Sequence, residues 1–266
     1  MRSILVHLDH DDCSVRLDLA RRLARDHGTR LVGLFAERAR AATVGTVATW
    51  PSEAYRRAAA ASRATFEAAT AGLPGAEWRD ADRGGDAEVT RAVIAAAHGV
   101  DLVVLGRDRG DHHHDSVPSG LAEKVILDSG RPCLVVPDAA HLPPHLGRRP
   151  LVAWNGSGAS VRALTDALPL MAKAEEVVLL TIGAIDDRVE ADCLRRFADH
   201  GLPVRAERLA PGDIAVMDLV LARAADNGAD LLILGAHEPG GLPWLQRPNG
   251  TRHVLALAPL PLLMSN

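Results

Sequence analysis

The chain has 266 residues, of which 47% are hydrophobic and 3% aromatic, and its formal net charge is −4. This composition excludes wholesale disorder and predicts packed cores built from aliphatic side chains. The weak negative charge excludes a general electrostatic attraction to nucleic acid or to an anionic membrane surface, so neither is expected as a partner.

In the first half of the chain, short apolar runs that predict buried strands alternate with helical apolar patterns. The predicted strands are 4–8, 31–36, 76–81, 101–106 and 132–136. The predicted helices are 15–27, 54–71, 85–97 and 120–127. Gly85 and Asp86 are expected to cap the third helix, with the Asp86 carboxylate accepting its first free amide protons. This alternation predicts parallel β-α-β units with right-handed crossovers.

The second half repeats the alternation. Its predicted strands are 150–154, 177–182, 204–209, 231–234 and 261–264, and its first two helices are 157–171 and 188–200. Gly212 and Asp213 are expected to cap a third helix, as Gly85 and Asp86 do in the first half. Between the halves, a segment with two prolines and a glycine is typical of a linker. We therefore predict domains at 1–138 and 149–266, joined by a linker at 139–148.

The two halves also share a motif. Asp101-Leu-Val-Val-Leu-Gly106 recurs as Asp230-Leu-Leu-Ile-Leu-Gly235, and a proline opens an apolar run after each copy, at Pro132 and Pro261. The spacing between the copies is that of a domain, which is longer than a solenoid repeat of about 20–50 residues. Differences between the halves should therefore locate function.

These motifs resemble those of the universal stress protein domain, and two copies in one chain resemble the tandem class of that family. The second half adds Ala153-Trp154-Asn155-Gly156-Ser157 and the ending Thr251-Arg252-His253, which are similar to motifs of that class. The resemblance implies two tandem doubly wound α/β domains with five-stranded parallel sheets of order 3-2-1-4-5, an adenine-binding type of fold. It also implies a pseudo-twofold relation, in which the fifth strands, Pro132–Val136 and Pro261–Met264, pair within one chain.

The nucleotide site of this family is a loop of pattern Gly-2x-Gly-9x-Gly-(Ser/Thr) after strand four, facing a carboxylate at the end of strand one. In the first half, Asp9 occupies the carboxylate position and Gly106 begins the loop. Arg109 replaces the second glycine, and Ser119 and Gly120 stand in reversed order. Arg107 and Arg109 could still contact phosphates, because guanidinium groups bind phosphate well.

In the second half, Gly235 begins the corresponding loop and Asn155 occupies the carboxylate position. Glu238 replaces the second glycine, and its charge would repel a polyanion. The Gly-Ser pair is replaced by Pro248 and Asn249, and the proline removes an amide donor. Gly250 and Thr251 follow one residue later and could offer an amide and a hydroxyl.

Neither loop is intact, so the leading hypothesis is a stress-response or scaffold protein with degenerate nucleotide loops. We assign no catalytic residues and require no cofactor, although weak ATPase activity stays open. One alternative is a sensor that binds ATP or AMP through one retained loop. A homodimer and an unidentified protein partner are further partners that the resemblance allows.

A second alternative is zinc binding by His112, His113 and His114 in the first loop, because imidazole nitrogens are common Zn²⁺ ligands. The competing interpretation, which we favour, is a solvated polar loop. The acidic run from Asp9 to Asp12 is interpreted as an N-cap cluster for the first helix rather than a metal site.

Three scattered cysteines, with no C-x-x-C pair, favour a reducing compartment. The first residues lack the apolar core of a signal peptide, and no run of 18 apolar residues occurs. We therefore expect a cytoplasmic protein without a membrane span. Cys13 is expected to be inert, because Asp11 and Asp12 beside it disfavour a thiolate.

Overall fold

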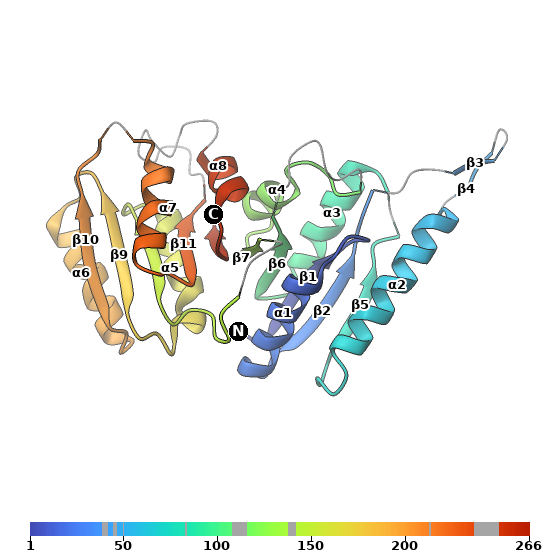
Figure 1. Ribbon diagram of the computed structural model, residues 1–266, viewed down its shortest axis with the longest axis horizontal. Coiled ribbons are helices and arrows are strands. Elements are labelled where there is room, and N and C mark those ends of the chain that lie inside the picture. The colour runs from blue at the N-terminus through green and yellow to red at the C-terminus, as the bar shows by residue number, and fades with distance from the viewer. Residues whose placement is uncertain are drawn as a thin grey trace. The chain divides into compact units, whose positions relative to one another are not determined.

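The computed structural model describes residues 1–38, 42–44, 47–49, 51–82, 84–107, 116–137, 142–212, 214–236 and 250–266, with backbone alone for 42–44 and 47–49. The chain divides into two compact units, Met1–Arg131 and Pro132–Asn266. Each unit contains a mainly parallel sheet with helices on both faces (Figure 1). Among the residues that the structure describes, no helix has both the length and the apolar character needed to cross a bilayer.

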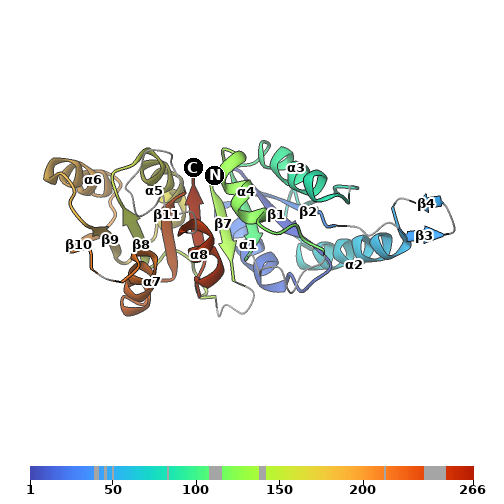
Figure 2. The ribbon, with the colours of Figure 1, turned by 90° about the horizontal axis from the view of Figure 1, so that it is seen from above.

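The sheet of the first unit has the strand order β6-β1-β2-β5, and all neighbours are parallel. Its strands are β1 (Ser3–Leu8), β2 (Arg30–Phe35), β5 (Glu77–Asp80) and β6 (Leu102–Gly106). Its helices are α1 (Ser14–His27), α2 (Glu53–Ala69), α3 (Asp86–Ala97) and α4 (Leu121–Asp128). Helices α1 and α2 cover one face, and α3 and α4 cover the other (Figure 2).

A small antiparallel hairpin of β3 (Ala42–Val44) and β4 (Val47–Thr49) precedes α2. The sequence analysis did not predict this hairpin. Its strands are only three residues long, too short for an alternating apolar pattern to be recognised.

The sheet of the second unit has the order β10-β9-β8-β11-β12-β7, parallel except for the last pair. Its strands are β7 (Cys133–Val136), β8 (Pro150–Trp154), β9 (Val177–Ile182), β10 (Val204–Leu209), β11 (Leu231–Gly235) and β12 (Leu262–Ser265). Its helices are α5 (Gly158–Met171), α6 (Asp187–Asp199), α7 (Val216–Asp226) and α8 (Gly250–Leu257). Helices α5 and α6 cover one face, and α7 and α8 the other (Figure 2).

Strand β7 pairs antiparallel with β12, with Leu134 opposite Leu263. By sequence these two strands are the predicted fifth strands of the two halves. Through this pairing β7 groups with the second compact unit, which begins at Pro132. The predicted domain limits, 1–138 and 149–266, stay a prediction.

The repeated aspartates hold the first strand of each unit. The Asp101 carboxylate accepts hydrogen bonds from the backbone N–H groups of Arg2 at 2.5 Å and Ser3 at 3.0 Å, at the start of β1. The Asp230 carboxylate accepts the corresponding bonds from Arg148 at 2.8 Å and Arg149 at 3.1 Å, before β8. The repeated motif therefore has a structural explanation at its aspartate end.

Helix capping follows the sequence in part. Ser52 and Ser157 cap α2 and α5, as side-chain oxygens at helix N-termini commonly do. Helix α3 begins after Gly85 as predicted, but the role expected for Asp86 is wrong. The Glu88 carboxylate accepts the Gly85 N–H at 3.2 Å, while the Asp86 carboxylate pairs with Arg38, three residues after β2, and does not cap the helix.

Candidate functional site

The predicted carboxylate and the first loop glycine of unit 1 lie at the same edge of the sheet. Asp9 directly follows β1, and Gly106 is the last residue of β6. Because β1 and β6 are adjacent and parallel, their carboxyl ends meet there. This edge is where ligands bind in open α/β sheets.

An arginine from α1 fills the space between these two residues. Arg16 Nη2 lies 2.5 Å from Asp9 Oδ2, and the two side chains are only 9% and 4% exposed. A Cβ placed on Gly106 would overlap Arg16 Nη1, so the guanidinium packs directly on the Gly106 backbone. The Arg16 side chain therefore occupies the space between the Asp9 carboxylate and the Gly106 backbone, the two positions that the resemblance assigns to a nucleotide site.

Burial and the ion pair together set the protonation states of Asp9 and His7. Burial opposes ionisation of Asp9, but the charge of Arg16, with smaller contributions from His7 and hydrogen bonds, holds its pKa well below the usual range. His7 is 2% exposed, and its Nε2 lies 2.7 Å from the Ala36 carbonyl oxygen, to which only an Nε2–H can donate. Burial first, and then the Arg16 charge, lower the pKa of His7 to about 4.

The acidic run after β1 orders the turn before α1, but its interpretation as an N-cap cluster is wrong, because Cys13 is the N-cap residue and no side chain caps the helix. Asp12 Oδ1 accepts the Ser14 N–H at 2.8 Å, and Asp9 Oδ1 accepts the Asp11 N–H at 2.8 Å. Burial raises the pKa of the Cys13 thiol to about 12, so this cysteine is a protonated thiol at neutral pH.

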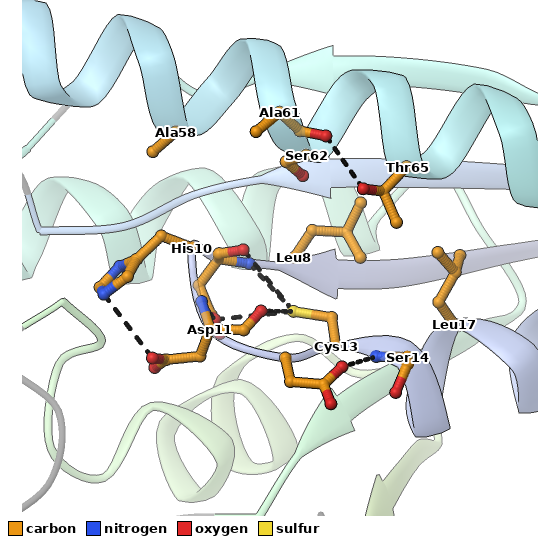
Figure 3. Close-up of a pocket in the computed structure, with 12 residues that line it drawn as sticks. Leu8, His10, Asp11, Cys13, Ser14, Leu17, Ala58, Ala61, Ser62 and Thr65 are labelled. Atoms are coloured by element: carbon orange, nitrogen blue, oxygen red, sulfur yellow. Dashed lines mark hydrogen bonds and ion pairs between the residues drawn. The ribbon is translucent and has the colours of Figure 1, made fainter.

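Beside the ion pair lies a pocket of about 280 Å³, bounded by the β1–α1 turn and by α2 (Figure 3). The turn contributes carboxylates to its lining, whereas α2 contributes small side chains, among them Ala58, Ala61 and Ser62. The volume is just below the usual range of about 300–1,000 Å³ for ligand sites. An acidic lining of this kind disfavours a polyphosphate.

His10, at the rim of this pocket, is held by a buried glutamate that follows β2. Both its backbone N–H and its Nδ1 lie 2.9 Å from Glu37 Oε2. Burial alone would lower the pKa of His10, but the hydrogen bond and the charge of Glu37 raise it above its ordinary value. His10 is thereby engaged with a carboxylate of the protein.

In the second unit, the matching positions have structural roles. Asn155 Oδ1 accepts the Ser157 N–H at 3.1 Å, which forms a turn that leads into α5. A Cβ on Gly235 would lie 2.6 Å from the Ser160 nitrogen and 2.7 Å from the Ala159 carbonyl carbon. Close packing of α5 on β11 therefore explains this glycine without a ligand.

The remaining predicted residues are dispersed or lie outside the described residues. Arg107 follows Gly106 and is half-buried, and its Nε has no hydrogen-bond partner among the described residues. Ser119 is exposed, and Gly120, with φ +72°, precedes α4. Gly250 and Thr251 begin α8. Outside the described residues lie Arg109, His112, His113, His114 and Asn249.

No group of three or more His, Cys, Asp or Glu side chains that could hold a metal ion occurs within the described ranges. The zinc alternative depends on the histidine tract, which those ranges do not include. It therefore stays a prediction.

The sequence analysis missed Arg16, His7 and Glu37. Arg16 interrupts the apolar pattern at the first turn of α1, seven residues after Asp9. An arginine within an apolar pattern suggests a charged residue at a buried position. The sequence does not show which way its long side chain points, so the contact with Asp9 could not be predicted.

Comparison with known structures identifies the fold. A universal stress protein from Archaeoglobus fulgidus DSM 4304 is 16% identical, with TM-score 0.70 over 99% of this chain and 96% of that chain. A putative universal stress protein from Pseudomonas aeruginosa UCBPP-PA14 is 17% identical, with TM-score 0.62 over 100% of this chain and 93% of that chain. No family model and no curated protein matches the sequence. The structural matches confirm the predicted fold class, and with it the resemblance at the level of the fold.

Proposed function

We propose that this chain, which has the fold of the tandem universal stress proteins, is a stress-response member of that family that acts without catalysis. In this proposal the protein acts by binding other proteins, and it does so through the surface of its folded domains and not through a nucleotide cleft. The cytoplasm is the compartment expected for such a role. We assign no catalytic nucleophile, and the part of the chain that the structure describes holds no group of three or more His, Cys, Asp or Glu side chains that could bind a metal ion.

One observation carries the proposal: the Arg16–Asp9 ion pair lies against Gly106 in the first unit. A nucleotide would have to displace the guanidinium and leave a buried carboxylate beside its phosphates. Breaking a buried ion pair by removing one partner costs about 3–5 kcal/mol, a cost that nucleotide binding would have to offset. In the second unit, Asn155 and Gly235 are already used by the start of α5.

The proposal is tested by deleting the gene in its source organism and scoring survival under starvation, oxidative and acid stress. We expect reduced survival that is restored equally by the wild type and by the double variant Asp9→Asn/Arg16→Met. Full survival of the deletion strain under every condition would contradict the stress-response role. Failure of the double variant, at wild-type protein level, would contradict a function independent of the cleft.

A nucleotide sensor is the second candidate, and the position of Arg107 favours it. This half-buried arginine begins the loop after Gly106, and its Nε has no partner among the described residues. A guanidinium in that setting could donate hydrogen bonds to an anion such as the single phosphate of AMP. If this candidate is right, the wild type binds AMP, and the Arg107→Gln variant binds AMP at least tenfold more weakly. Equal AMP affinity of the two proteins would exclude this residue.

A further inference from the structure

A second pocket of the first unit lies at the opposite edge of its sheet, where β2 begins. It has a volume of about 470 Å³, within the range of small-molecule sites. Its walls are the end of α1, the end of α2 and the turn 71–75 that follows α2. Small and apolar residues line much of it, among them Ala24, Ala69, Leu73 and Pro74.

The pocket contains a buried hydroxyl with no hydrogen-bond partner among the described residues. Thr29 is 3% exposed and lines the pocket, and its Oγ1 is the atom concerned. A buried polar atom without a partner costs about 1–3 kcal/mol. A ligand acceptor in the pocket would satisfy it.

Three arginines surround the same pocket: Arg21, Arg25 and Arg30. The contact of Arg25 Nε with Asp26 measures 3.3 Å, and those of Arg30 with Glu77 and the Gly99 carbonyl both measure 3.4 Å. These are long for charge-assisted hydrogen bonds, which are usually about 2.7–2.9 Å. A ligand carboxylate could therefore compete for the guanidinium groups of Arg25 and Arg30, whereas Arg21 already forms a close ion pair with Asp18.

The two helix C-termini at the pocket would ordinarily repel an anion. Several of their terminal carbonyls, however, accept hydrogen bonds from the chain itself. The backbone N–H of Thr29 donates to the Ala24 carbonyl at 2.8 Å, and the N–H of Gly28 donates to Arg25 at 3.3 Å. In α2, both the N–H and the hydroxyl of Thr70 donate to Phe66, at 2.9 and 2.7 Å.

We propose that this pocket binds a small amphipathic carboxylate, with its apolar body against the alanines and its carboxylate between Thr29 and the arginines. The inference is independent of the proposed function, because the pocket lies at the amino end of β2 and shares no residue with the pocket beside Asp9.

The test uses octanoate as the probe, with calorimetry on the full chain and amide chemical shifts of Gly28, Gly72 and Gly75 as the reporter of location. We expect saturable binding that shifts these three glycines. Thr29→Val should weaken binding at least threefold while leaving the melting temperature unchanged or higher, because the Thr29 hydroxyl has no hydrogen-bond partner in the described part of the chain. Arg25→Gln/Arg30→Gln should weaken binding at least tenfold.

The matched control is Arg57→Gln, which changes an exposed arginine paired with Glu53 on the same unit and should leave octanoate affinity unchanged. The neutral analogue 1-octanol should bind at least tenfold more weakly than octanoate. Equal binding of 1-octanol, absence of octanoate binding, or unchanged affinity in the Thr29 or arginine variants would overturn the proposal.

Discussion

At the scale of single residues, the most consequential feature is the buried pair of Asp9 and Arg16. The two charges neutralise each other, so neither is left unpaired beside Gly106. A buried ion pair is weak evidence for stability, since well-packed neutral residues often replace one without loss. Its effect here is that the Arg16 side chain fills the space beside Gly106.

The pair makes a prediction about stability. Arg16→Met should lower the free energy of unfolding by about 3–5 kcal/mol, because it leaves the Asp9 carboxylate buried and unpaired. The double variant Asp9→Asn/Arg16→Met should lose much less, since no charge remains unpaired. Urea unfolding measures both.

The control for this prediction is Arg57→Met, whose partner Glu53 is exposed and whose loss should cost less than about 1 kcal/mol. If Arg16→Met lowered the free energy of unfolding no more than this control does, the Asp9–Arg16 pair would not be buried in solution.

His7 makes a prediction about pH. The unfolded chain binds a proton at His7 near pH 6.5, whereas the folded chain does so only near pH 4. Between these values the unfolded state holds more protons, so His7 costs the fold stability as pH falls from 6.5 toward 4. The slope is about 1.4 kcal/mol per pH unit, and roughly 3 kcal/mol in total.

The measurement compares urea midpoints of the wild type and His7→Gln at pH 7, 6 and 5. Glutamine retains a donor for the Ala36 carbonyl and does not titrate, so the variant should be less sensitive to pH in this window. His10, whose pKa is raised, acts in the opposite direction above pH 6.5, but it is common to both proteins and cancels. Parallel pH profiles for the two proteins would refute the neutral, buried state of His7.

At the scale of elements, the two loop glycines differ in what a side chain would meet. At Gly106 the obstacle is the end of the Arg16 side chain, whereas at Gly235 it is the backbone of α5. A side chain can move aside, but helix backbone cannot move without repacking the helix. The same motif position therefore tolerates change differently in the two units.

Gly235→Ala should lower the free energy of unfolding by at least about 2 kcal/mol, as is typical of overpacking a tight interface. The matched control is Gly212→Ala in the same unit, where an added Cβ meets nothing within 4 Å. That change should cost less than about 0.5 kcal/mol. Similar melting temperatures for the two variants would show that α5 does not pack closely on β11.

At this scale the sequence predicted most of the fold, because strand and helix patterns differ clearly in period and the strands alternate with helices. It predicted the order 3-2-1-4-5 only through the family resemblance. The backbone role of Asp101 and Asp230 could not be predicted, since it depends on which strand starts beside them. The role of Arg16 could not be predicted because it depends on a rotamer and on tertiary packing.

At the scale of the whole molecule, we expect β7 and β12 to pair within one chain rather than between two chains. Cys133 lies opposite Met264 in the register of this pair. Directly opposed residues in antiparallel strands are about 4.5–5.5 Å apart, which suits a disulfide.

Met264→Cys, in a background with Cys13→Ala and Cys193→Ala, should therefore form a disulfide on mild oxidation. Mass spectrometry and a non-reducing gel should locate it within a monomer. A covalent dimer would indicate exchange of the last strand between two copies. No cross-link at all would contradict the pairing itself.

The measurement that tests the central claim most directly is calorimetry of the purified, metal-free chain with ATP, ADP and AMP. The account predicts no saturable binding up to millimolar concentrations, because Arg16 and Asp9 occupy the cleft of the first unit and α5 abuts Gly235 in the second. Saturable binding near one site per chain, lost in Asp9→Asn, would contradict it and establish a working nucleotide site.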